Sequence, residues 1–360
     1  MSNWQSTSFS SSERLIKVSV FVGRMLTTVL ILEITGGGKG RTAFCQVPPV
    51  DRSNKIKPVL DYSTYPLTSL GGMLLTLVQS GIASYPNKHV VLQYFETVAR
   101  YTDFFKVRKE CILPTLEAMI DPRWVFSFIC IHEADLVSRG LHNEDTSYRF
   151  RLYYLFYKFI KENRAELSPD LSPTIIDIIR DLLPVAIEMP ELEEGEPDVL
   201  GEFVRGTNFD SQLYLFETAG ILTSLTSKTP DRQTGLLLSL VKPLLDDLST
   251  NLQLFREKGL NMEDWNSLVP VVKVHHIIMA LGDIAKGFPD HPSVTPESSR
   301  MPSLEVFSEI ARVILVCLEA MNVFKVVRDA VCVLDPLFDG FADWSRCVGR
   351  NRRGLHLHAS

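Results

Sequence analysis

Apolar residues recur at helical spacing through most of this 360-residue chain, from about Tyr65 to Ala330. Val91, Phe95 and Val98, for example, share one face of a helix over "LQYFETVARY". No run alternates with period two for long enough to build a sheet, so the sequence predicts an all-α fold. Further helices are expected over 71–82, 148–160, 172–186, 212–225, 235–254, 271–285 and 303–317, with Pro243 kinking or dividing its helix.

Three of these helices carry an aromatic-rich centre, in "LQYFETV", "YYLFYKF" and "LYLFETA". Their central residues Phe95, Phe156 and Phe216 are 61 and 60 positions apart, more than the ~40–47 residues of a HEAT or armadillo unit. A shared catalytic element would explain the repeated Phe-Glu-Thr, but an aromatic stripe at helical spacing is normally core. We therefore predict a HEAT-repeat-like α-solenoid, a superhelix of antiparallel helix pairs, with these three rings buried.

The predicted organisation has three parts: an irregular N-terminal segment over 1–65, the repeat region over 66–330, and an irregular C-terminal tail over 331–360. Both ends are interpreted as disordered or non-native sequence. Within the repeat region, "WVFSFICIHEADLVSR" at 124–139 has no cap or turn chemistry. Its removal would shorten the first aromatic interval to a HEAT-like length, so we interpret it as translated intron or another gene-model error.

Composition excludes several classes of protein. The net charge of −6 argues against a generally basic nucleic-acid binder, although it leaves room for a local basic patch. The six cysteines contain no C-x-x-C, so neither a disulfide framework nor a zinc site is predicted, and a buried, inert thiol is expected for each. No segment is predicted to span a membrane.

Motifs for catalysis or cofactor binding are incomplete. "TGGGKGRT" at 35–42 departs from the phosphate-loop pattern and is read as a flexible linker, and "IHEAD" at 131–135 lacks the second histidine of a zinc protease. His275 and His276 point in two directions on a helix and are read as one packed and one exposed ring. We predict no catalytic residue, no cofactor and no metal site.

The one basic surface that the sequence nominates is on the helix over 147–164. Arg151 and Lys158 lie almost in line at 100° per residue, with Lys161 to one side, so these three are the candidate phosphate contacts. Leu155 and Glu162 fall within the same strip, which is also what a solvated face would show. The core side is assigned to Phe150, Tyr153, Phe156, Tyr157 and Ile160.

Several blocks together resemble the exportin-T family of tRNA nuclear export receptors: "SGIASYPNKHVVLQYFETVARYTDFF", "ILPTLEAMIDPR", "GLHNEDTSYRFRLYYLFYKFIKENR" and "SQLYLFETAGILTSLTSKTPDRQTGLLLSLVKPLLDDL". The resemblance covers roughly 68–123 and 140–330, a middle portion of much longer chains. The family reads through the position where 124–139 is inserted here.

The resemblance implies a non-enzymatic carrier of the importin-β superfamily. Such a carrier binds tRNA together with Ran-GTP, passes nuclear pore components without inserting into a membrane, and shuttles between nucleus and cytoplasm. A generic HEAT-repeat scaffold that joins proteins and never touches RNA is the alternative. An enzyme with an unrecognised site is a third reading.

Overall fold

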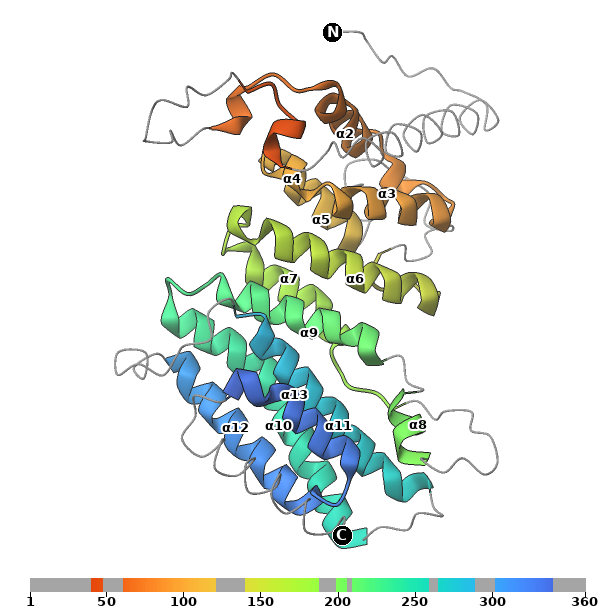
Figure 1. The fold of residues 1–360 in the computed structure, drawn as a ribbon, viewed down its shortest axis with the longest axis vertical. Coiled ribbons are helices and arrows are strands. Elements are labelled where there is room, and N and C mark those ends of the chain that lie inside the picture. The colour runs from red at the N-terminus through yellow and green to blue at the C-terminus, as the bar shows by residue number, and fades with distance from the viewer. Residues whose placement is uncertain are drawn as a thin grey trace, which may run out of the picture. The chain divides into compact units, whose positions relative to one another are not determined.

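The structure is a computed structural model that describes residues 40–47, 61–120, 140–187, 199–205, 209–258, 265–288 and 302–338. These residues form helices and no strand longer than the isolated bridge between Cys45 and Leu67, so the all-α prediction is confirmed. The chain divides into two compact units, Met1–Thr115 and Leu116–Ser360, which we call the N-terminal and C-terminal units (Figure 1).

The N-terminal unit contains α2 (Ser69–Gln79), α3 (Lys88–Arg100), α4 (Thr102–Phe105) and the start of α5 (Ile112–Ile120). Asn87 caps α3 by accepting hydrogen bonds from the amides of His89 and Val90. The apolar face of α3 buries Phe95 completely, as predicted.

Within the segment predicted to be irregular, residues 40–47 pack against the rest of the N-terminal unit. Phe44 is fully buried and packs edge-to-face against Phe104 at 6.1 Å. Its carbonyl accepts a hydrogen bond from the amide of Thr68, and a Cβ added at Gly71 would lie 2.2 Å from that oxygen. The Phe44 side chain fixes this segment to the core, which the glycine-rich sequence before it did not indicate. Residues 1–39 and 48–60 lie outside the described residues.

The C-terminal unit consists of two layers of helices (Figure 1). One layer is formed by α6 (Thr146–Asn163), α9 (Phe209–Ser224), α11 (Trp265–Lys286) and α13 (Lys325–Phe338). The other contains α7 (Leu171–Ile179), α10 (Pro230–Lys258) and α12 (Pro302–Met321), while the short α8 (Val199–Arg205) contacts α11 and α13.

Contacts within each layer have a nearly constant sequence offset. Tyr154 meets Tyr214, and Tyr157 meets Glu217, both pairs being 60 positions apart. Moving forward along α6 therefore moves forward along α9, which requires the two helices to be parallel. In the other layer Asp170 pairs with Arg232 at an offset of 62, and Arg180 reaches the carbonyl of Ser239 at an offset of 59.

The same arrangement continues to the C-terminal end of the described chain. Phe209 stacks on His276 between α9 and α11, and a Cβ on Gly220 of α9 would touch the carbonyl oxygen of Ile284. Between α11 and α13, Gly282 lies against Leu334. Parallel helices within a layer, connected through helices of the second layer, are the arrangement of an α-solenoid, so this prediction is also confirmed.

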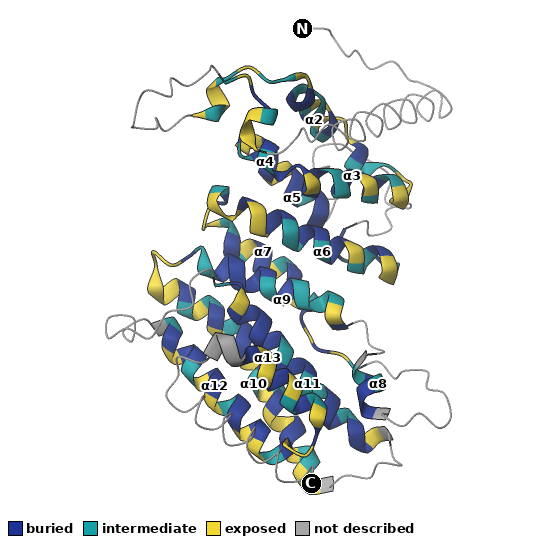
Figure 2. Cartoon of the chain, viewed as in Figure 1, coloured by how far each residue is buried: buried dark blue, intermediate teal, exposed yellow. Residues whose placement is uncertain are grey.

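The core lies between the layers (Figure 2). Phe156 is fully buried and Phe216 is 1% exposed. With Phe95, all three central phenylalanines are therefore core residues, as predicted. Helix α11 is long and apolar enough to cross a membrane by length and composition, but 78% of that apolar window is buried inside the protein. Its packing against α9, α10 and α13 accounts for that composition.

Three local expectations differ from the structure. Helix α13 continues to Phe338, so the irregular tail begins later than 331; residues 339–360 lie outside the described residues. Helix α10 is not divided at Pro243, and the Ser239 carbonyl that the missing proline N–H would have used accepts a hydrogen bond from Arg180 at 3.4 Å. Cys332 is exposed, whereas Cys45, Cys111 and Cys317 are buried as expected.

The suspected insert 124–139 lies outside the described residues, but residues on both sides of it lie together. The amide of Leu141 donates to the carbonyls of Met119 at 3.2 Å and Ile120 at 3.3 Å. Without the sixteen residues 124–139, Leu141 would follow Ile120 by five positions, the separation at which an amide closes the C-terminus of a helix. The insert remains a proposal, which this geometry supports.

Deleting 124–139 to join Arg123 directly to Gly140 is expected to leave the melting temperature unchanged or higher, because the flanking contacts already exist. Circular dichroism and thermal unfolding measure this. A deletion variant that loses cooperative unfolding would contradict the proposal.

Phe156→Ala is expected to lower the free energy of unfolding by about 3–5 kcal/mol, because it leaves a cavity between the layers. Phe150→Ala, on the partly exposed side of the same helix, is the matched control and should cost less than half as much. Chemical denaturation of both variants measures the difference. Equal costs would contradict the assignment of Phe156 to the core.

Candidate functional site

The three predicted phosphate contacts all lie on α6. Asp145 begins this helix, accepting a hydrogen bond from the amide of Tyr148 at 2.9 Å. Arg151 and Lys161 are exposed, and Lys158 is partly exposed. The structure therefore presents these cations on one side of α6, away from its buried face.

The helix is rotated slightly from the predicted orientation. Leu155, expected to interrupt the basic strip, is only 3% exposed and belongs to the core. Phe150 and Tyr157, expected in the core, are partly exposed. For Tyr157 the reason is that α9 packs against the Tyr154 and Tyr157 rings, so Tyr157 lies at the α6–α9 contact with one edge toward solvent.

Aromatic rings and cations alternate along the α6–α9 contact. The guanidinium of Arg151 lies 5.1 Å from the centre of the Tyr154 ring, and the ammonium of Lys161 lies 5.0 Å from the centre of Tyr157. Tyr214 of α9 packs against both tyrosines, at centroid distances of 5.2 Å and 5.3 Å. Each cation gains a favourable contact with a ring face.

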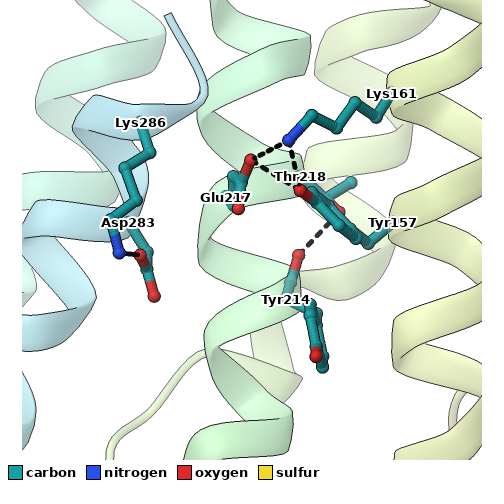
Figure 3. A network of polar contacts seen from close by, with 7 residues as sticks. All are labelled: Tyr157, Lys161, Tyr214, Glu217, Thr218, Asp283 and Lys286. Carbon is teal, nitrogen blue, oxygen red and sulfur yellow. Dashed lines mark hydrogen bonds and ion pairs between the residues drawn. The ribbon is translucent and has the colours of Figure 1, made fainter.

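Lys161 is also neutralised by an acidic residue of the neighbouring helix. Glu217 Oε1 accepts a hydrogen bond from the Tyr157 hydroxyl at 2.8 Å and from Lys161 Nζ at 3.0 Å (Figure 3). Lys161 Nζ also donates to the Tyr157 hydroxyl. We call Tyr157, Lys161 and Glu217 the bridging triad, because it joins α6 to α9.

Burial controls the protonation of this triad. It raises the pKa of Tyr157 to about 12, so the hydroxyl keeps its proton and acts as a donor to Glu217. Burial disfavours charge on Lys161, but the hydrogen bonds to Tyr157 and Glu217 outweigh it and raise the lysine pKa. The bridge is therefore a charge-assisted one at neutral pH.

A second polar contact lies in α11 beside the triad (Figure 3). Asp283 is 5% exposed and forms an ion pair with Lys286 one turn further along the helix. Burial raises the pKa of Asp283 to about 6, with Lys286 opposing the rise and the negative charges of Glu217 and Asp210 adding to it. Asp283 and Glu217 thus repel each other across the α9–α11 contact.

The two adjacent histidines of α11 are both removed from bulk water. His276 is fully buried and stacks on Phe209 at 4.1 Å, which confirms the packed ring. His275 is partly buried rather than exposed, with its Nδ1 3.0 Å from that of His276. Burial lowers the pKa of His276 to about 3 and that of His275 to about 4, so both rings are neutral near pH 7.

Over the described ranges, no group of three or more histidine, cysteine or acidic side chains could hold a metal ion. "IHEAD" and the first five residues of "TGGGKGRT" lie outside those ranges. Gly40, the first described residue of the latter stretch, donates its amide to the Asp103 carboxylate at 3.0 Å. The linker interpretation therefore does not hold for Gly40–Arg41.

Sequence reasoning missed Tyr214 and Glu217 as partners of the basic strip. The signal was the equal spacing of the aromatic centres: aligning Phe156 with Phe216 places Tyr154 opposite Tyr214 and Tyr157 opposite Glu217. As a result, Arg151 and Lys161 are both held on aromatic rings, and Lys161 is also paired to the Glu217 carboxylate. Lys158 makes no ion pair within the part of the chain that the structure describes.

Asp283→Asn is expected to stabilise the protein near pH 7.5 and to have little effect near pH 4. The folded-state pKa of about 6 exceeds the ordinary value of 3.8, so ionisation costs the folded state free energy as pH rises from 4 through 6. The cost is at most about 3 kcal/mol, and this figure already includes the opposing effect of Lys286 on the pKa. Unfolding measured at both pH values gives the difference; a larger gain at pH 4 would contradict the assignment.

Comparison with known proteins finds one family over most of the chain. The exportin-T family model matches residues 57–333. Exportin-T of Laccaria bicolor is 58% identical over 294 residues, which is 82% of this chain and 25% of that protein. Exportin-T of Coprinopsis cinerea is 59% identical over 295 residues, 82% of this chain and 26% of that protein.

A more distant relative agrees with these two. Exportin-T of Mycosarcoma maydis is 36% identical over 269 residues, covering 74% of this chain and 22% of that protein. The chain thus spans about a quarter of the length of the curated relatives that it matches. The helical solenoid fits this match, and with the family model matched over 57–333 and relatives 58–59% identical, this chain belongs to the exportin-T family.

Proposed function

We propose that the chain is part of a tRNA nuclear export receptor, which binds tRNA cooperatively with Ran-GTP and carries it from the nucleus to the cytoplasm. The observation that carries this proposal is the family membership, with about 58–59% identity to two proteins named exportin-T. Nuclear pore components are the further partners, and the chain acts without catalysis or membrane insertion.

The fold supports a role in binding rather than in chemistry. Stacked helices of a solenoid form extended surfaces, and a ligand held by many repeats needs no local motif. This is why a segment spanning about a quarter of its relatives contributes only part of a binding surface. Cooperation between tRNA and Ran-GTP would follow if both favoured the same curvature of the solenoid, and each would then tighten the other equally.

Arg151 and Lys158 are the proposed phosphate contacts on α6. Both present cations to solvent, and Arg151 is held in place over Tyr154. Lys161 belongs to the same strip, but its charge is compensated by Glu217 at 3.0 Å. Phosphate contact through these two side chains is expected to be weak and strongly salt-dependent.

The test is tRNA binding by the complete chain at about 50 mM and 200 mM salt, with and without Ran-GTP. Arg151→Glu/Lys158→Glu is expected to weaken binding and to reduce the slope of log K against log salt by about 2, one for each lost phosphate contact. Lys228→Glu/Lys325→Glu, at two exposed positions on other elements, changes the charge equally and is the matched control.

Two outcomes would contradict the proposal. If both double variants changed tRNA affinity equally, the basic strip on α6 would be a solvated face and not a tRNA contact. Absence of tRNA binding at 50 mM salt, with Ran-GTP present, would favour a protein–protein scaffold, a reading consistent with the net charge of −6.

A further inference from the structure

We propose that Tyr157 and Lys161 form an anion site that Glu217 occupies in this structure, and that a phosphate oxygen of bound nucleic acid replaces the Glu217 carboxylate as the partner of Lys161. The proposal rests on the proposed function for the identity of the ligand. It makes Glu217 a residue that limits affinity at the α6–α9 contact.

The geometry of the bridging triad is that of a bound oxyanion. Two donors from α6, the Tyr157 hydroxyl and Lys161 Nζ, converge on the single oxygen Oε1 of Glu217, at 2.8 Å and 3.0 Å. A charged acceptor between a hydroxyl and an ammonium is the arrangement in which phosphate oxygens are also bound. Tyr157 follows Tyr154 by three residues, and Lys161 follows Lys158 by three residues, so the site joins the basic strip on one helix.

The two partners differ in how far they can move toward solvent. The Lys161 side chain is 48% exposed, whereas that of Glu217 is 15% exposed. Lys161 can therefore turn its ammonium to an external anion while Glu217 stays between the helices. Release of Glu217 toward α11 is opposed, because the carboxylate of Asp283 lies on that side.

Glu217 also has an electrostatic reason to be replaceable. An ion pair with one half-exposed partner is a weak interaction, since water competes for the exposed ammonium. Each external phosphate that pairs with a lysine releases counterions, which favours the exchange at low salt. The carboxylate would thus suppress binding of a lone anion and yield to a polyanion that engages Arg151 and Lys158 at the same time.

The test compares Glu217→Gln with Glu162→Gln in the complete chain. Both variants remove one negative charge, but Glu162 is exposed and lies outside the bridging triad. Glutamine keeps an oxygen acceptor for the Tyr157 hydroxyl, so the helix contact is preserved. Glu217→Gln is expected to bind tRNA roughly two- to fivefold more tightly than Glu162→Gln at low salt, the factor that corresponds to a half-exposed ion pair.

Two further variants make the result independent of net charge and of side-chain loss. Glu217→Asp withdraws the carboxylate from Lys161 without changing the charge and should also raise affinity over the parent chain. Adding Lys161→Met to Glu217→Gln should cancel the gain. Equal affinities of Glu217→Gln and Glu162→Gln, or a gain that survives Lys161→Met, would overturn the anion site.

Elution from immobilised heparin separates this proposal from the proposed function. If the parent chain and all variants fail to bind tRNA, but Glu217→Gln elutes at higher salt than Glu162→Gln, the anion site stands and the tRNA function fails. If tRNA binds and the two variants behave alike on tRNA and on heparin, the function stands and the anion site fails.

Discussion

The packing of α6 on α9 in parallel, offset by 60 positions, is the contact on which the rest of the C-terminal unit depends. It brings two equivalent aromatic stripes together, with Phe156 and Phe216 inside. Because the offset recurs in the second layer, between Asp170 and Arg232, each repeat positions the next one as a whole. This fixed alignment of neighbouring helices, their register, places the partly exposed sides of successive helices next to one another as one surface.

Register also decides which charges are available to a ligand. The same offset that buries the aromatic centres brings Glu217 to Lys161 and Tyr157. A helical wheel of α6 alone shows Lys161 as an exposed cation, but Glu217 of the neighbouring repeat partly neutralises its charge. For a solenoid, charge must be assigned across two stacked helices before a binding surface can be recognised.

Much of the fold could be predicted from residue patterns alone. Helical periodicity identified the helices, and the equal spacing of three phenylalanines identified repeats whose centres are buried. The periodicity could not place Phe44, because one aromatic residue in a glycine-rich context has no period, yet its packing on Phe104 fixes residues 40–47. It predicted that Pro243 would kink or divide its helix; the helix is not divided there, and the Ser239 carbonyl accepts a hydrogen bond from Arg180 instead.

The candidate site could be predicted only in part. A helical wheel placed Arg151, Lys158 and Lys161 together, but projected Leu155 outward and Tyr157 inward, since it contains no information on where α9 packs. The register of α6 against α9 is tested most directly by nuclear Overhauser effects between tyrosine rings in tyrosine-labelled protein. Effects from Tyr214 to the rings of both Tyr154 and Tyr157 are predicted. Effects from Tyr214 to Tyr148 or Tyr153 instead would show a different register and contradict the account.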